Sequence, residues 1–156
     1  MFPDPIVINE WIFHDIDGTN GLQAQQRVEL FLEALKNGND RIVVLRESPW
    51  AYKAWQLWTH NDVRVQILSK LLYLGILIDP LKLIYLSPGE VQPLPPGLAE
   101  QVPDDDVYLF QTAIAGGARI IVTTDGRLIE AVTNANQHGI ELRLRDNFYA
   151  DYLGLL

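Results

Sequence analysis

Residues 106–125 read DVYLFQTAIAGGARIIVTTD, and this stretch decides the fold class. The three aspartates 104–106 follow Pro103 and open a predicted helix that runs to Ala115 and ends at Gly116-Gly117. The β-branched run 119–123 then predicts a buried strand. A helix that leads directly into a fully apolar strand is typical of α/β proteins.

Outward from this stretch, the same alternation continues along the whole chain. Short apolar runs predict strands at 5–9, 42–45, 81–86, 119–123 and 140–145. Helical periodicity and end signals predict helices at 22–37, 49–58, 61–78, 104–115, 128–137 and 146–152. Within these helices Ser48 and Asn61 are the expected N-caps and Gly38 an expected C-cap. The prediction is one three-layer α/β/α domain over residues 1–156, with a central, mostly parallel sheet of about five strands.

Two features refine this architecture. The segment 140–145 alternates apolar and charged residues, which predicts a half-buried edge strand. Residues 87–103 hold five of the nine prolines, which predicts an irregular surface connection.

Composition narrows the classes of function. The chain has 156 residues, no cysteine and a net charge of −8, which excludes thiolate chemistry and argues against nucleic-acid binding by bulk charge. The longest apolar run covers residues 71–78, too short for a membrane span, and no signal peptide precedes it. A cytoplasmic protein without membrane attachment is expected.

Acidic residues follow several of the predicted strands. Glu10 and Glu47 follow the first two strands, Asp125 follows the fourth, and the aspartates 104–106 end the proline-rich connection. Ligand sites of parallel sheets lie at the carboxyl ends of the strands. Carboxylates gathered there repel one another, and Mg²⁺ or Mn²⁺ is the hard cation that oxygen ligands suit.

Helix capping is the simpler role for the same residues. An aspartate at a helix start often accepts a backbone N–H bond. At least one of the aspartates 104–106 is therefore expected to cap the helix that follows, and Asp125 before Gly126 fits the same role. Glu47 before Ser48-Pro49 fits a solvated acid of a first helical turn.

The order of Asp106, Thr112-Ala113, Gly117 and residues 121–125 (IVTTD) resembles the C-terminal motif of PIN-domain nucleases. The resemblance implies hydrolysis of phosphodiester bonds in RNA with Mg²⁺ or Mn²⁺. It implies that Asp106 and Asp125 bind the metal or orient its water. Many small members of this family are toxins neutralised by an antitoxin protein, and that partner is implied here too.

The N-terminal half departs from the family pattern. Asn9 and Lys53 stand where the family has acids, and Glu10 and Glu47 are the nearest substitutes. The resulting hypothesis assigns catalysis to Glu10, Asp106 and Asp125, metal binding to these three with Asp105 and Glu47, and substrate contacts to Asn9, Arg46, Lys53, Thr124 and Arg127. The alternative is a non-catalytic PIN-like module that binds RNA or protein.

Aromatic residues crowd the helix at 49–58. Trp50, Tyr52, Trp55 and Trp58 can stack on bases of single-stranded RNA. Packing in the core or in a homodimer is the favoured alternative. His14, beside Asp15, is a weaker candidate for acid–base chemistry.

Overall fold

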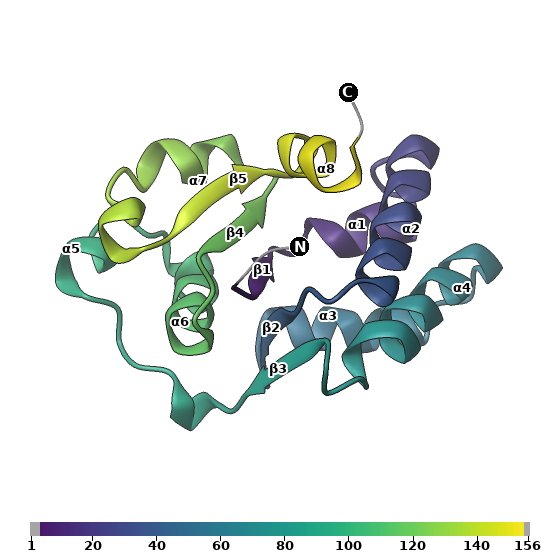
Figure 1. Cartoon of the computed structure of the whole chain (residues 1–156), viewed down its shortest axis with the longest axis horizontal. Coiled ribbons are helices and arrows are strands. Elements are labelled where there is room, and N and C mark those ends of the chain that lie inside the picture. The colour runs from purple at the N-terminus through teal and green to yellow at the C-terminus, as the bar shows by residue number, and fades with distance from the viewer. Residues whose placement is uncertain (1–3, 155–156) are drawn as a thin grey trace.

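The computed structural model describes residues 4–154 and contains a single five-stranded sheet (Figure 1). The strands are β1 (Ile6–Ile8), β2 (Ile42–Leu45), β3 (Leu83–Leu86), β4 (Ile120–Thr123) and β5 (Glu141–Leu144). Their order is β3-β2-β1-β4-β5, and every neighbouring pair is parallel. The predicted parallel sheet of about five strands is confirmed, with β5 at an edge as expected.

Helices connect the strands and cover both faces of the sheet, which confirms the three-layer α/β architecture. They are α1 (Trp11–Asp17), α2 (Leu22–Asn37), α3 (Pro49–Trp58), α4 (Val63–Leu72), η1 (Tyr73–Leu77), α5 (Pro96–Ala99), α6 (Val107–Gly116), α7 (Gly126–Ala131) and α8 (Arg145–Leu153). Short 3₁₀ turns lie at η2 (Pro88–Glu90), η3 (Asp104–Asp106) and η4 (Ala135–His138).

The period-two alternation of each strand produces two separate apolar cores. Ile6 and Ile8 of β1 pack with α1 to α4 and α8, whereas Val7 points to the opposite face, toward α6 and α7. The same division holds in β2 and β4. Because these strands are buried on both faces, their sequences are continuous apolar runs.

Helix α6 approaches the sheet closely because of Gly116. A Cβ atom at this position would lie 2.4 Å from Cγ1 of Val43 in β2. The next residue, Gly117, ends the helix with φ of +72°. The two glycines therefore fix both the depth of α6 and the turn into β4.

Several predicted boundaries differ from the structure. Residues 11–17 form α1, which was not predicted, and residues 96–99 of the proline-rich connection form α5. The helix expected over 128–137 is interrupted at Val132, where ψ is +82°. Asp62, not Asn61, caps α4 through a bond from the Val65 N–H.

The prediction that an aspartate of 104–106 caps the following helix was wrong. Asp106 precedes α6 with φ of −105° and ψ of −4°, and its side chain accepts no capping bond. A capping side chain needs an extended backbone at that position. The 3₁₀ turn removes this geometry, and the Asp106 carboxyl stays available for other contacts. Ser48 caps α3 as predicted, and Gly38 follows α2 as predicted.

Candidate functional site

A cleft of about 600 Å³ lies beside the carboxyl ends of β1 and β2. Its walls come from the segment after β1, the start of α3, the η3 turn and the first turns of α6. The lining residues are Glu10, Pro49, Lys53, Asp104, Asp105, Val107, Tyr108 and Gln111. Three of the predicted site residues, Glu10, Lys53 and Asp105, therefore share one cleft.

Both carboxylate oxygens of Glu10 are engaged within the protein. Oε1 lies 2.5 Å from Nζ of Lys53, and Oε2 accepts a hydrogen bond of 2.5 Å from the Tyr108 hydroxyl. Burial, followed by this bond to Glu10, raises the pKa of Tyr108 far above its usual value. Tyr108 thus stays a donor at neutral pH, and Glu10 is held by one cation and one phenol.

Asp106 lies at the centre of the acidic residues. Burial is the largest cause that raises the pKa of its carboxyl, and the charges of Asp125, Asp105 and Glu10 raise it further. The fold therefore brings the carboxyl groups of Asp125, Asp105 and Glu10 close enough to act on Asp106.

Asp125 serves the fold as well as the acidic cluster. One of its oxygens accepts bonds from the backbone N–H groups of Arg127 and Leu128, which confirms the predicted cap of α7. The hydroxyl of buried Thr123 accepts the Asp125 N–H at 3.0 Å and an Asn9 side-chain N–H at 3.2 Å. Asn9 and Asp125 are thus joined through Thr123 at the ends of β1 and β4.

The remaining predicted residues lie outside the cluster. Glu47, with φ of +61°, lines a neighbouring hollow and is not among the charges that act on Asp106. Arg46 lies over the ring of Tyr85, 4.4 Å from its centroid. Thr124 and Arg127 are exposed near the start of α7. The exposed His14 lies 3.9 Å from Asp17 and not in this cluster.

The donor set suits a hard cation in its chemistry, because coupled carboxylates that repel one another are relieved by positive charge. Within residues 4–154, however, no three acidic, histidine or cysteine side chains are arranged as a ready metal site. Glu10 already forms an ion pair with Lys53. Any divalent ion would therefore be held first by Asp106 and its aspartate neighbours.

Helix α3 divides its aromatic residues between core and surface. Trp50 is 4% exposed and packs edge-to-face on Phe13, whereas Tyr52 and Trp55 are 62% and 59% exposed. Trp58 lies against Tyr73, with ring centroids 4.9 Å apart. Trp50 therefore packs in the core, and Trp58 is partly covered by Tyr73. Tyr52 and Trp55 remain on the surface.

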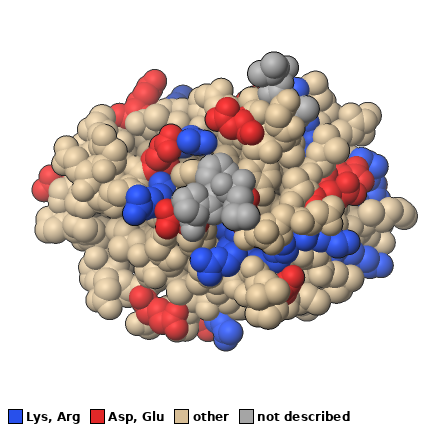
Figure 2. All heavy atoms as spheres, viewed as in Figure 1, with Lys and Arg blue, Asp and Glu red and all other residues tan. Residues whose placement is uncertain are grey.

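Charge over the surface is mixed. Figure 2 shows basic and acidic side chains interspersed on the viewed face. With a net charge of −8, affinity for a polyanion would have to come from local contacts.

No family model, curated protein or solved structure matches the chain. In residues 4–154 no helix is both long and apolar enough to cross a membrane. The description of the candidate site therefore rests on the structure of this chain alone.

Sequence reasoning missed the role of Tyr108. It lies two residues after Asp106, and its hydroxyl points to Glu10, which is 98 residues away in the chain. A tyrosine inside an apolar helix pattern reads as core, so no local signal distinguished it. The fully buried Asp15 was also missed, because the Arg145 side chain that donates to it at 2.7 Å lies 130 residues away in the chain.

Proposed function

We propose that this chain is a PIN-like, metal-dependent ribonuclease whose site is built around Asp106. The observation that carries the proposal is the electrostatic coupling of Asp106 to Glu10, Asp105 and Asp125 beside the carboxyl ends of the strands. Parallel sheets bind their ligands at this edge. The resemblance of residues 106–125 to the PIN motif supports RNA as the substrate.

Each residue of the site would have a separate task. Asp106, Asp125 and Asp105 would hold the cation, and Asn9 would keep the Asp125 segment in place through Thr123. A bound Mg²⁺ or Mn²⁺ supplies an activated water and offsets charge on the phosphodiester. Lys53 and Arg127 would contact phosphate oxygens of the RNA.

Glu10 would not bind the cation in the arrangement that the structure shows. Its oxygens bind Lys53 and Tyr108, so its share in catalysis requires that Lys53 turn to a phosphate instead. Lys53 is 40% exposed and its long side chain can make that exchange without a change in the backbone.

A cleavage assay tests the proposal. The wild-type chain, with Mn²⁺ and a single-stranded RNA of mixed sequence, is compared with Asp106→Asn, Asp125→Asn and the double variant. Asparagine can still cap α7 at position 125, so loss of activity there would not reflect a lost cap. We expect cleavage that requires Mn²⁺ and disappears in each variant. Equal cleavage by wild type and double variant would overturn the proposal.

A second candidate, a non-catalytic PIN-like module for RNA or protein, is favoured by the Lys53–Glu10 ion pair. In that case Lys53 is a permanent counter-charge and no metal is required. This candidate predicts RNA binding without cleavage, and no change of melting temperature with millimolar Mn²⁺. A rise of several degrees that the double variant lacks would exclude it.

The biological setting of either candidate rests on the resemblance. A toxin neutralised by an antitoxin protein, acting in the cytoplasm, would arrest growth when expressed alone. Expression of Asp106→Asn should then leave growth unaffected. The exposed Tyr52 and Trp55 would be available for an antitoxin or a second copy of the chain.

A further inference from the structure

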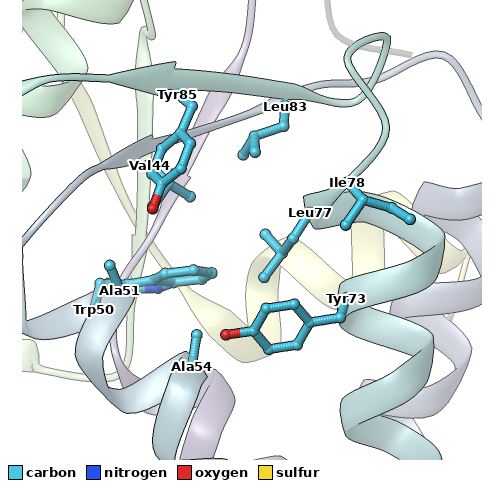
Figure 3. A pocket seen from close by; sticks show the side chains of 9 residues that line it. All are labelled: Val44, Trp50, Ala51, Ala54, Tyr73, Leu77, Ile78, Leu83 and Tyr85. Atoms are coloured by element: carbon cyan, nitrogen blue, oxygen red, sulfur yellow. The ribbon is translucent and has the colours of Figure 1, made fainter. Parts of the chain in front are cut away.

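A second pocket lies between α3, the η1 turn and the strands β2 and β3 (Figure 3). Its volume is about 110 Å³. The residues that line it are Val44, Trp50, Ala51, Ala54, Tyr73, Leu77, Ile78, Leu83 and Tyr85. Ile78 and Tyr85 are 65% and 47% exposed, so the pocket has an accessible rim. None of its residues belongs to the acidic cluster.

Three hydrogen-bonding groups stand among the apolar walls. The indole nitrogen of Trp50 is buried and has no hydrogen-bond partner within residues 4–154. Figure 3 shows the rings of Tyr73 and Tyr85 reaching toward Trp50 from η1 and β3. Burial and the neighbouring Tyr85 raise the pKa of Tyr73, so its hydroxyl keeps its proton. Because a buried donor without a partner is costly, a ligand acceptor that reaches the Trp50 N–H would be stabilising.

The pocket and the acidic cleft have a common neighbour, a hollow that shares one lining residue with each of them. Ala51 belongs both to this pocket and to a hollow formed by Glu47, Ser48, Pro49, Tyr52 and Trp55. Pro49 belongs both to that hollow and to the cleft of Glu10 and Lys53. The three hollows therefore follow one another beside α3, and the exposed rings of Tyr52 and Trp55 lie in the middle one.

Arg46 adds a positive charge beside the pocket. Its guanidinium lies over Tyr85, a residue of the pocket, and no ion pair among residues 4–154 includes it. An arginine with this freedom can bind a phosphate next to an inserted base.

We infer that the pocket of Trp50, Tyr73 and Tyr85 holds one unstacked pyrimidine base of a single-stranded RNA that crosses α3 toward the acidic cleft. The inference rests on the proposed function, since it specifies how the same RNA is held. Bases of single-stranded RNA stack on aromatic rings and bond through their edges. The carbonyl oxygens of uracil can accept hydrogen bonds from the Trp50 N–H and from the two phenols.

Size favours a pyrimidine over a purine. An engineered apolar cavity of roughly 150 Å³ holds benzene. The present pocket has about 110 Å³ and an open rim, so one six-membered ring fills it. A two-ring purine is larger and would protrude farther from the rim. The pocket is thus predicted to select for uridine at one position of the RNA.

Binding is measured without metal, so that the result does not depend on cleavage. Fluorescein-labelled oligo(U) and oligo(A), each of equal length, are titrated by anisotropy with the full chain in EDTA. Trp50→Phe removes the N–H donor and keeps an aromatic ring against Phe13. Tyr73→Phe removes one hydroxyl. Tyr149→Phe is the matched control, because its hydroxyl is also buried without a partner but lies in α8, outside the pocket.

We expect the wild type to prefer oligo(U), and Trp50→Phe and Tyr73→Phe each to weaken this binding about 3- to 10-fold, the effect of one lost hydrogen bond. Tyr149→Phe should bind as the wild type does. Equal affinity for oligo(A), no binding by the wild type, or unchanged binding by both pocket variants would overturn the inference. Cleavage with an unchanged base preference would leave the proposed nuclease intact and remove only the base pocket.

Photocrosslinking tests the same inference on the wild-type chain, so the result does not depend on whether a variant folds. The wild-type chain is irradiated with oligo(U) that carries 4-thiouridine, and the crosslinked peptides are identified by mass spectrometry. Adducts on Trp50, Tyr73 or Tyr85 support the inference. Adducts confined to other residues contradict it, and saturable binding of an apolar peptide that excludes oligo(U) would assign the pocket to a protein partner.

Discussion

Nζ of Lys53 lies 2.5 Å from Oε1 of Glu10, and this ion pair joins α3 to the end of β1 inside the candidate cleft. In the PIN-like nuclease that we propose, the lysine would stand at the place of an acid, and the glutamate would lie next to another such place, Asn9. The pair therefore determines whether Glu10 can contribute a ligand to a metal ion bound by the acidic cluster.

Lys53→Met should strengthen the response of the chain to Mn²⁺, because it removes the cation that competes for Glu10. The expected result is a larger rise of melting temperature with millimolar Mn²⁺ than in the wild type. Without metal, the loss of this half-exposed pair should cost no more than about 1 kcal/mol. Lys70→Met, on the exposed side of α4, is the control and should respond as the wild type does. An unchanged Mn²⁺ response in Lys53→Met would show that Glu10 takes no part in metal binding.

The raised pKa of Asp106 predicts a dependence of stability on pH. The folded chain keeps a proton on Asp106 at pH values where the unfolded chain, with the ordinary pKa of 3.8, has lost it. The folded state then binds more protons, so this group's contribution to the free energy of unfolding falls as the pH rises above that value. Asp106→Asn cannot titrate and lacks this fall.

Denaturant unfolding at a series of pH values from about 4 to 7 measures this effect. Relative to the wild type, Asp106→Asn should gain stability as the pH rises. Asp104→Asn is the matched control from the same turn, since Asp104 is not among the charges that act on Asp106. Parallel curves for wild type and Asp106→Asn would disprove the coupling of the acids.

Gly116→Ala tests the close contact of α6 with β2. The added Cβ would meet Val43 at 2.4 Å, so the helix or the strand must shift, at a cost of about 1–3 kcal/mol in unfolding free energy. Gly89→Ala has open space around it and should change stability little. Val43→Ala should recover part of the loss in the Gly116→Ala background. A double variant no more stable than expected from independent effects would argue against this contact.

Arg145→Met tests the buried ion pair of the other layer. Asp15 is fully buried, and Arg145 and Asn20 both donate to its Oδ1 at 2.7 Å. Removal of the arginine leaves a buried carboxyl without its cation, which typically costs about 3–5 kcal/mol. The ion pairs of Arg143 with Glu141 and Asp151 involve exposed acids, so Arg143→Met should lose less stability than Arg145→Met, about 1 kcal/mol for each such pair at most. Similar losses in the two variants, measured by urea unfolding, would contradict this difference.

The sheet could be predicted from the sequence because the apolar composition of its central strands indicates that they are buried. Apolar runs such as residues 42–45 and 120–123 have no polar face, which only a sheet covered on both sides allows. The caps at Ser48 and Asp125 were predictable for a similar reason, since both precede a helix start with a hydrogen-bonding side chain.

Features that depend on tertiary contacts could not be predicted. Helix α1 begins at Trp11 with no capping side chain, so its start has no local signal. The contacts of Glu10 with Lys53 and Tyr108 join segments 43 and 98 residues apart, and no spacing rule reports them. The acids near Asp106 were predictable as a group through the strand ends, whereas the counter-charge among them was not.

Calorimetric titration of the wild type and Asp106→Asn with Mn²⁺ tests the central claim most directly, that the carboxylates around Asp106 hold a divalent cation. The account predicts saturable binding by the wild type, with a proton released from Asp106 where the pH is low enough to leave it protonated, and loss of that binding in Asp106→Asn. Absence of binding by the wild type, or the same binding by both chains, would contradict it.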